Sequence, residues 1–559
     1  MMSSIKPTNS IKIAFFFLLA IGVFLRIFKL GLIPVGLNAD EASIGYEAYS
    51  ILKTGADRWG IQLPPYFLSF GSGQNTLYAY LSVPFLYFFD LNQHSIRLLS
   101  AFLGLGTIPL VYLFAKLLFK NYYFVLAATL LYLFDPYLFM ISRWALEYNI
   151  LPFFVIFSLY LFTKTFLTIS SEEKLNFSKK LILIFSFPSL ALIIYTYASA
   201  LFIIPAFMGL IFIYFWQDIK RHKLLFSASI ALFFFILCPF ILFILKNHVL
   251  KTELAIEQYL PFEIPKMLSN REEVYKGFGK NLALIKKNFI FVFSGFKEFD
   301  RAINTTKFFT PHFFLVFSLL GLIYLAQQAY NQLNNQFKVL YFWSLSCLIP
   351  FLLFEMNLNR SVHLQAVVPI LSLIGVFIFM ENILDTRFKK QLLCAFIGLF
   401  CIQSVIFYGE YFYRFRNYDQ FVTNFDGAIK VANQSKKPSE KIVITSQLVF
   451  NYLFVGFYEK YPPALLHKTL KADFSHPNVA VHSFEGYYIL GDYANEGYYL
   501  NAEVFDRIKK EKSFLALLAQ NEKIEDYKIN DKSLIDTSLY SQKNIYKSTE
   551  WKVVAFNKK

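Results

Sequence analysis

Charged residues are scarce in this chain of 559 residues. Asp, Glu, Lys and Arg together make up 16%, whereas 56% of the residues are hydrophobic and 19% are aromatic. A soluble domain carries about a quarter charged residues. The composition therefore excludes an ordinary soluble protein and predicts a polytopic α-helical membrane protein. The net charge of +16 then reflects lysines and arginines kept on the cytoplasmic side of the spans, and we expect no nucleic acid partner.

Cysteine is also rare, and several common motifs are missing. Cys238, Cys347, Cys394 and Cys401 all lie inside apolar segments, which leaves none for a disulfide bond outside the membrane or for a CxxC metal site. The sequence has no Walker loop and no GxGxxG, so it lacks a standard phosphate loop. Its eight histidines show no HExxH spacing, which gives a zinc site no support.

Long apolar runs are frequent, and each run of about twenty residues predicts a membrane-spanning helix. We expect about eleven spans, near residues 11–30, 96–118, 122–141, 150–168, 181–199, 200–217, 224–245, 312–329, 338–354, 363–381 and 390–409.

The run 76–91 is shorter than the others, holds Pro84 and ends at Asp90. If it does not cross the membrane, the lysine clusters of the short loops share the side of the N-terminus, as the positive-inside rule requires. We therefore expect a juxtamembrane or re-entrant helix at 76–91. The same assignment predicts a cytoplasmic N-terminus and a C-terminal region outside the plasma membrane.

This topology predicts two domains with a boundary at residue 409. Residues 1–409 form the transmembrane domain, with a first outer loop at 31–95 and a large outer loop at 246–311. Residues 410–559 are richer in Lys, Asp, Glu and Asn, and they are long enough for a small extracytoplasmic α/β domain.

Short apolar runs give a coarse secondary structure for this last domain. Residues 441–445 and 551–556 predict strands, and residues 512–520 predict a helix.

Carboxylates and arginines gather at the predicted outer face. The acidic pair Asp40-Glu41 directly follows the first span. The other members of this set are Arg58, Arg97, Arg143, Glu147, Arg360 and His363. A carboxylate can take a proton from an acceptor hydroxyl, and guanidinium groups can bind a phosphate leaving group. The set therefore suits transfer of a group from a phosphate-linked donor.

Each of these residues also has a structural alternative. Asp40 could cap a helix that begins at Glu41. Arg143 and Glu147 could form an i,i+4 ion pair on a helix. Arg360 could anchor on lipid head groups, and a histidine at the start of a span, such as His363, could pack without a chemical role.

Four stretches together resemble the GT-C superfamily of glycosyltransferases, in its protein O-mannosyltransferase and aminoarabinose transferase branch. They are residues 37–42, 71–84, 97–100 and 142–149. The similarity covers roughly residues 10–410. It implies inverting transfer of a sugar from a polyprenyl-phosphate-linked donor in the membrane to an extracytoplasmic glycan, glycopolymer, lipid or protein.

The resemblance also implies roles for single residues. Asp40 matches the first-loop catalytic acid, which acts as general base, and Glu41 is its neighbour. Arg143 and Glu147 fall where the second-loop motif of the family lies. Glu147 stands where relatives often carry Asp.

The remaining roles are assigned from residue type. Arg143, Arg360, Arg58 and Arg97 would bind the donor phosphate. Glu147 and His363 would support the site or hold a divalent metal, if the enzyme uses one. A flippase or transporter of lipid-linked sugars and a non-enzymatic cell-envelope scaffold are the alternative functions.

Overall fold

The computed structural model describes most of the chain. The described ranges are 8–70, 73–171, 175–267, 283–288, 312–330, 335–383, 386–414, 421–445, 450–473, 480–494, 497–500, 502–529, 532–533 and 536–559. They belong to two compact units, each made of three separate segments. The first unit holds Met1–Leu30, Arg97–Ile241 and Glu272–Tyr418, and the second holds Gly31–Ile96, Leu242–Arg271 and Asp419–Lys559. These units differ from the predicted domains 1–409 and 410–559, because the second unit joins the predicted first outer loop to the C-terminal region.

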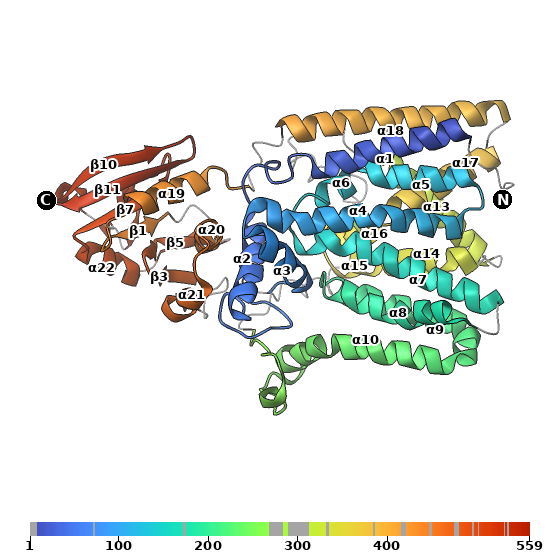
Figure 1. Cartoon of the computed structure of the whole chain (residues 1–559), viewed down its shortest axis with the longest axis horizontal. Helices are drawn as coiled ribbons and strands as arrows, with labels where there is room; N and C mark the ends of the chain where they lie inside the picture. Colours follow the sequence, from blue (N-terminus) through green and yellow to red (C-terminus); the bar gives the residue numbers. More distant parts are fainter. Residues whose placement is uncertain are drawn as a thin grey trace. The chain divides into compact units, whose positions relative to one another are not determined.

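The first unit consists of apolar helices that run side by side (Figure 1). They are α1 (Asn9–Ile27), α4 (Gln93–Leu118), α5 (Tyr122–Phe134), α6 (Pro136–Ile141), η1 (Glu147–Ile150), α7 (Leu151–Ser171), α8 (Phe177–Ile194), α9 (Ala200–Arg221), α10 (Lys223–Ile244), α13 (His312–Tyr330), α14 (Asn335–Ser346), α15 (Ile349–Leu353), α16 (Leu358–Gln365), α17 (Val368–Ile383) and α18 (Thr386–Arg414). Each predicted span coincides with one of these helices or with a pair separated by a short break.

Length and composition support a multi-pass membrane protein. Among the described residues, seven helices are long and apolar enough to cross a membrane, and α16 and α17, bent by 48°, make an eighth if they form one span. The shorter apolar helices include α5. Eleven crossings therefore stay a prediction.

The break between α5 and α6 shows how an interrupted helix is stabilised inside the apolar unit. Asp135 caps α6, since its Oδ1 accepts the Leu138 N–H at 2.8 Å. At the end of α5, the buried Arg26 side chain donates to the Leu133 carbonyl at 2.6 Å. An anion thus meets the helix start and a cation meets the helix end, which satisfies backbone groups that lipid could not.

The second unit begins with two helices from the predicted first outer loop, α2 (Ala39–Thr54) and α3 (Leu77–Phe89). A helix of 13 residues is about 20 Å long, whereas the hydrocarbon core of a bilayer is about 30 Å thick. The α3 helix is therefore too short to cross a membrane, in agreement with the expectation for 76–91. The second unit also contains the one-turn segments η2 (Leu245–Leu250) and η3 (Glu257–Tyr259).

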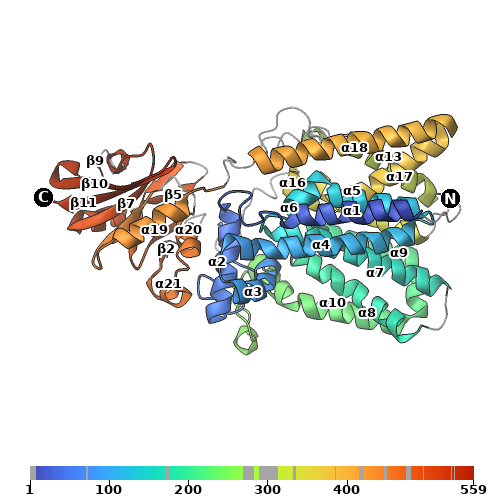
Figure 2. The same cartoon turned by 45° about the horizontal axis from the view of Figure 1, so that its top comes forward.

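The C-terminal part of this unit is built around a seven-stranded mixed sheet with the order β10-β11-β7-β1-β4-β3-β2 (Figure 2). Its strands are β1 (Lys441–Ile444), β2 (Lys471–Asp473), β3 (Ala480–Phe484), β4 (Tyr487–Ile489), β7 (Ser513–Ala519), β10 (Tyr540–Lys547) and β11 (Trp551–Lys558). Two small hairpins, β5 (Gly491–Ala494) with β6 (Gly497–Leu500) and β8 (Lys528–Ile529) with β9 (Lys532–Ser533), lie outside it. The helices are α19 (Phe425–Ser435), α20 (Asn451–Tyr458), α21 (Pro463–Thr469) and α22 (Ala502–Lys510), with the short turns η5 (Ile524–Asp526) and η6 (Thr537–Leu539).

The predicted helix at 512–520 is wrong, because these residues form β7. The strand pairs with β1 in parallel and with β11 antiparallel. Phe514, Ala516 and Leu518 face a core shared with α22, and Leu515 and Leu517 on the opposite face are also buried. A strand buried on both faces has a continuous apolar run instead of alternating apolar and polar residues. Such a run is easily mistaken for a helix in the sequence.

Candidate functional site

The predicted acidic pair lies in the first turn of α2, and Asn38 caps that helix. The Asn38 Oδ1 accepts the Asp40 N–H at 2.8 Å, and the Asn38 N–H donates to Glu41 Oε2 at 3.3 Å. These two contacts belong to a capping box, which satisfies otherwise unpaired N–H groups of the first turn. The prediction that Asp40 caps a helix beginning at Glu41 is therefore wrong.

The capping box gives the two neighbouring carboxylates different environments. The Glu41 side chain is fully buried and closes the box. Asp40 occupies the second helical position and is only partly buried. The helix start stabilises a negative charge at this position. Asp40 is thus the member of the pair that can meet a substrate from solvent.

Tight packing in the second unit fixes the position of α2. A Cβ atom on Gly45 would lie 2.5 Å from the Phe457 ring, and one on Gly456 would lie 3.2 Å from the Tyr46 ring. The Tyr46 hydroxyl also donates to the Tyr461 carbonyl at 2.9 Å. The sheet domain therefore holds the helix that carries Asp40 through a close helix–helix contact with α20.

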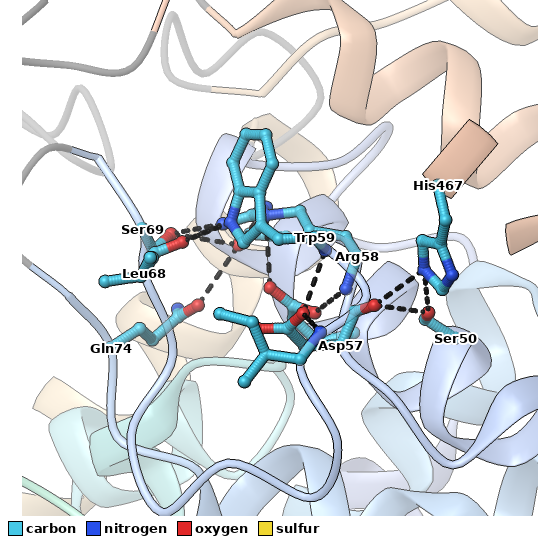
Figure 3. Close-up of polar contacts among 11 residues, drawn as sticks. Ser50, Asp57, Arg58, Trp59, Leu68, Ser69, Gln74 and His467 are labelled. Atoms are coloured by element: carbon cyan, nitrogen blue, oxygen red, sulfur yellow. Dashed lines mark hydrogen bonds and ion pairs between the residues drawn. The ribbon is translucent and has the colours of Figure 1, made fainter. Parts of the chain in front are cut away.

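A buried ion pair connects α2 to the loop that follows it (Figure 3). Arg58 Nε lies 3.1 Å from Glu47 Oε1, and the Arg58 backbone N–H donates to Glu47 Oε2 at 2.8 Å. The guanidinium also donates to the hydroxyls of Ser43 and Ser69. Both charged side chains are excluded from solvent. Arg58 therefore stabilises the first loop in this structure, and its predicted contact with a donor phosphate stays a prediction.

Asp57 adds a second buried carboxylate to this cluster. Its Oδ1 accepts the N–H groups of Trp59 and Ile61, both at 2.9 Å. Its Oδ2 is buried without a hydrogen-bond partner among the described residues. Burial raises the pKa of Asp57 well above its usual value, and the neighbouring Glu47 charge raises it further. Burial likewise raises the pKa of Glu47, although the Arg58 charge opposes this shift.

His467 of α21 contacts the same loop. Its Nε2 lies 2.8 Å from the Asp57 carbonyl and 3.5 Å from the Ser50 hydroxyl. Burial lowers the pKa of His467, so the neutral imidazole that donates to this carbonyl is favoured. The C-terminal part of the chain thus meets the first loop through a polar contact as well as through α20.

The other predicted residues lie in the first unit, with Arg143 fully buried after α6. Its guanidinium donates to the carbonyls of Leu25, Arg26 and Phe28, each at 2.8 Å. It also lies 5.2 Å from the centre of the Phe412 ring. These bonds satisfy carbonyls at the end of α1, so the structure gives Arg143 a packing role.

The predicted helix joining Arg143 to Glu147 is absent. The α6 helix ends at Ile141, and Glu147 opens the separate turn η1. The two residues therefore do not lie one turn apart on a single helix. Arg97, in the first turns of α4, is also fully buried.

Arg360 and His363 lie on α16, the first half of the bent pair. Arg360 is partly exposed and donates to the Glu355 carbonyl. His363 is buried, and its Nδ1 lies 3.3 Å from the Ser199 hydroxyl, while its Nε2 has no partner among the described residues. Of the four predicted phosphate-binding arginines, Arg360 is therefore the one that solvent reaches.

Metal ligands do not cluster in the part of the chain that the structure describes. No group of three His, Cys, Asp or Glu side chains comes together there. Neither Glu147 nor His363 therefore belongs to such a group of three among these residues.

A large apolar cavity lies in the same unit as Arg360. Its volume is about 770 Å³. Residues of α9, α13, α14, α15, α16 and α17 line it, including Gly209, Leu322, Leu352, Leu364 and Leu371. Leu364 follows Arg360 by one turn of α16, so a cationic side chain occurs close to the lining of an apolar space.

Sequence reasoning missed Asn38, Glu47, Asp57 and His467. Asn38 carried a signal, since Asn followed three residues later by Glu is a capping-box pattern. The contacts of Glu47 with Arg58 and of His467 with Asp57 depend on the tertiary fold, and no spacing in the sequence indicates them.

The fold of this chain is similar to that of several solved structures. ArnT from Cupriavidus metallidurans bound to undecaprenyl phosphate matches with a TM-score of 0.54 and 11% identity, over 98% of each chain. AglB, the oligosaccharyltransferase of Archaeoglobus fulgidus, matches in its complex with an inhibitory peptide and a dolichol-phosphate, with a TM-score of 0.52 and 12% identity. This chain has the GT-C fold. That finding confirms the fold that the resemblance implied and the fold class expected from the sequence.

The match to the archaeal enzyme is partial in length. It covers 82% of this chain but 64% of the archaeal chain, so this chain spans a little under two thirds of that relative. The match to ArnT extends over nearly the whole of both chains.

Sequence comparison gives a narrower result. The family described as dolichyl-phosphate-mannose-protein mannosyltransferase matches residues 61–254. This segment contains Arg97, Arg143 and Glu147. No curated protein matches the chain.

Proposed function

We propose that this GT-C protein is an inverting glycosyltransferase that uses a polyprenyl-phosphate-linked sugar. The observation that carries the proposal is the pair of environments in the first turn of α2. Glu41 is buried in the capping box, whereas Asp40 is held partly exposed beside it. The GT-C fold supports this role, since the similar structures carry undecaprenyl phosphate or dolichol-phosphate.

Asp40 acts as the general base in this mechanism. Its carboxylate takes the proton of an acceptor hydroxyl while the hydroxyl oxygen attacks the anomeric carbon of the donor sugar. The bond between that carbon and the phosphate oxygen breaks, and its electron pair leaves with the lipid phosphate. Attack opposite the leaving group inverts the anomeric centre, and no covalent sugar–enzyme intermediate forms.

The first unit offers groups for the lipid part of the donor. The cavity of about 770 Å³ is wide and apolar enough to hold several isoprene units. Arg360, partly exposed one turn before Leu364, is the arginine that we assign to the leaving phosphate. A guanidinium is suited to this role because it binds phosphate through two parallel hydrogen bonds.

The acceptor belongs to the extracytoplasmic side in this proposal. The charge pattern of the loops supports a cytoplasmic N-terminus, and the C-terminal sheet domain would then lie outside the plasma membrane. Nucleotide sugars are absent outside the cell, so a transferase that acts there needs a donor delivered through the membrane. The acceptor is a hydroxyl of a cell-surface glycan, glycopolymer, lipid or protein.

Substitution of Asp40 tests the proposal. Asp40→Asn keeps the size of the side chain but removes the base, and we expect sugar transfer to fall by about 10² to 10⁴. Transfer would be measured with purified protein and a radiolabelled polyprenyl-phosphate sugar. Asp426→Asn is the matched control, because Asp426 is an exposed first-turn carboxylate of α19.

Two results would contradict this assignment. Transfer at the wild-type rate in Asp40→Asn would exclude Asp40 as the base. Movement of the lipid-linked sugar across vesicles without any transfer, unchanged in Asp40→Asn, would identify a flippase instead.

A further inference from the structure

A small polar pocket lies where α10 ends, in the second unit. Its volume is about 220 Å³, and its lining residues are Lys246, Asn247, Lys251, Thr252, Glu253, Lys266 and Met267. The mechanism proposed above uses none of these residues.

Two side chains of η2 build this pocket by folding the following loop back. Asn247 donates to the Pro265 carbonyl at 3.0 Å and accepts the Met267 N–H at 2.7 Å. Lys246 is nearly buried, and its ammonium donates to the Ile264 carbonyl at 2.9 Å. Side-chain hydrogen bonds therefore hold the loop in place and define the shape of the pocket.

Two of the three lysines that line the pocket can bind an anion. Lys246 is neutralised by Glu253 and Glu257, each with an oxygen 2.6 Å from its ammonium. Lys251 and Lys266 are exposed, and neither forms an ion pair within the described ranges. Two ammonium groups and the Thr252 hydroxyl thus offer donors to an anion at the rim.

Exposed apolar side chains surround this cationic rim. Val249 is 61% exposed and Leu250 is 53% exposed, and both directly precede Lys251. Ile256 and Tyr259 of the loop are also exposed. The helix through Leu250 is the most apolar of the candidate spans, with a mean hydropathy of 2.8. A pocket at the end of such a span, edged by apolar groups and lysines, is placed at the level of lipid head groups.

We propose that this pocket binds the phosphate group of an anionic membrane lipid. Lys251 and Lys266 contact the phosphate oxygens, and the Thr252 hydroxyl donates to one of them. Glu253 accepts a hydrogen bond from a hydroxyl of the head group. Val249 and Leu250 contact the first methylene groups of the acyl chains.

Lipid binding to the full-length protein tests this proposal without measuring sugar transfer. Native mass spectrometry would count retained lipids during titration with phosphatidylglycerol and, separately, with phosphatidylcholine. Two lysines near a head group contribute about 1 kcal/mol each, which corresponds to about thirtyfold in affinity. We expect Lys251→Gln/Lys266→Gln to weaken phosphatidylglycerol binding by that order and to leave phosphatidylcholine binding unchanged.

Matched variants separate this pocket from a general charge effect. Lys509→Gln/Lys510→Gln removes two exposed charges from α22 and should bind phosphatidylglycerol as the wild type does. Lys251→Arg/Lys266→Arg should also retain binding. Free glycerol phosphate should compete poorly, because it lacks the acyl chains that Val249 and Leu250 contact.

Other results would overturn the proposal. Equal loss in the pocket variant and the α22 variant would show an unspecific attraction of charge. Full competition by free glycerol phosphate would identify a soluble phosphate ligand instead of a lipid. These readouts are independent of Asp40, so the transferase assignment and the lipid pocket can fail separately.

Discussion

Asn38 and Glu41 cap α2 reciprocally, with the Asn38 N–H 3.3 Å from Glu41 Oε2. Asp40 lies between them and owes its position to both. Within the acidic pair, this arrangement separates a residue that can do chemistry from one that positions it. The two carboxylates are adjacent in sequence and yet serve different purposes.

The first prediction concerns Glu41 as a positioning residue. Glu41→Gln keeps an oxygen that accepts the Asn38 N–H, and a capping box works with Gln at this position. We expect this variant to retain most of the kcat, whereas Glu41→Ala should lose about 1 kcal/mol of stability and at least tenfold in kcat. Thermal unfolding and kcat measured side by side check this. A Glu41→Gln variant as inactive as Asp40→Asn would instead make Glu41 part of the chemistry.

The second prediction concerns the buried pair of Glu47 and Arg58. Arg58→Met leaves the Glu47 charge without its cation, which costs about 3–5 kcal/mol of folding free energy. The double variant Glu47→Gln/Arg58→Met removes both charges and keeps a side-chain oxygen that accepts the backbone N–H of residue 58. Its loss of folding free energy should therefore be much smaller. Thermal unfolding in detergent measures both. If Arg58→Met were as stable as the wild type but bound the donor weakly, Arg58 would be a phosphate ligand.

The third prediction distinguishes Arg143 from Arg360, which were both assigned to the donor phosphate from residue type alone. Arg143→Gln removes bonds to the end of α1 and should lower the melting temperature. Arg360→Gln should leave the melting temperature unchanged and raise the KM for the lipid donor by about 10- to 100-fold, since a charged hydrogen bond contributes about 1.5–3 kcal/mol. A melting curve and a donor titration for each variant decide between the two roles. An unchanged KM in Arg360→Gln would remove Arg360 from the donor site.

The sequence predicted the helical part of the fold well because membrane spans are long apolar runs. Every predicted span has a helix at its position, and α3 is as short as the run 76–91 suggested. The β7 strand was predicted as a helix because a strand buried on both faces has no alternation to reveal it. Hydrophobic patterns therefore predict a helix or strand correctly when its buried residues recur with the period of that element.

The candidate site was less predictable because most of its contacts join distant segments. The sequence indicated Asp40 through its place after a span, and the Asn38 pattern could have revealed the cap. Arg143 and Arg58 show the limit of residue type as evidence. Both are arginines near a predicted membrane surface, and in the fold both are buried and donate to groups of the protein itself.

The fourth prediction concerns pH and the buried carboxyl of Asp57. Burial and the Glu47 charge raise its pKa in the folded state, whereas an unfolded Asp has a pKa of about 3.9. A raised pKa means that the folded state holds the proton more tightly, so the stabilisation is complete below the unfolded pKa and is lost as the pH rises through the folded value. Asp57→Asn keeps the acceptor for the Trp59 and Ile61 N–H groups and cannot ionise. We therefore expect the wild type to lose melting temperature as the pH rises above about 4, and Asp57→Asn to lose less.

Asp90 provides the control of opposite sign for this measurement. The Lys460 ammonium lowers the pKa of Asp90, so the stabilisation from this exposed pair is present above the usual pKa and is lost as the pH falls. Asp90→Asn should therefore cost a little stability at neutral pH and nothing in acid, with an effect below about 1 kcal/mol. Melting temperatures of the three proteins across this pH range test both signs. A wild-type curve that rises with pH and is unchanged by Asp57→Asn would show that the Asp57 carboxyl is not the group that titrates.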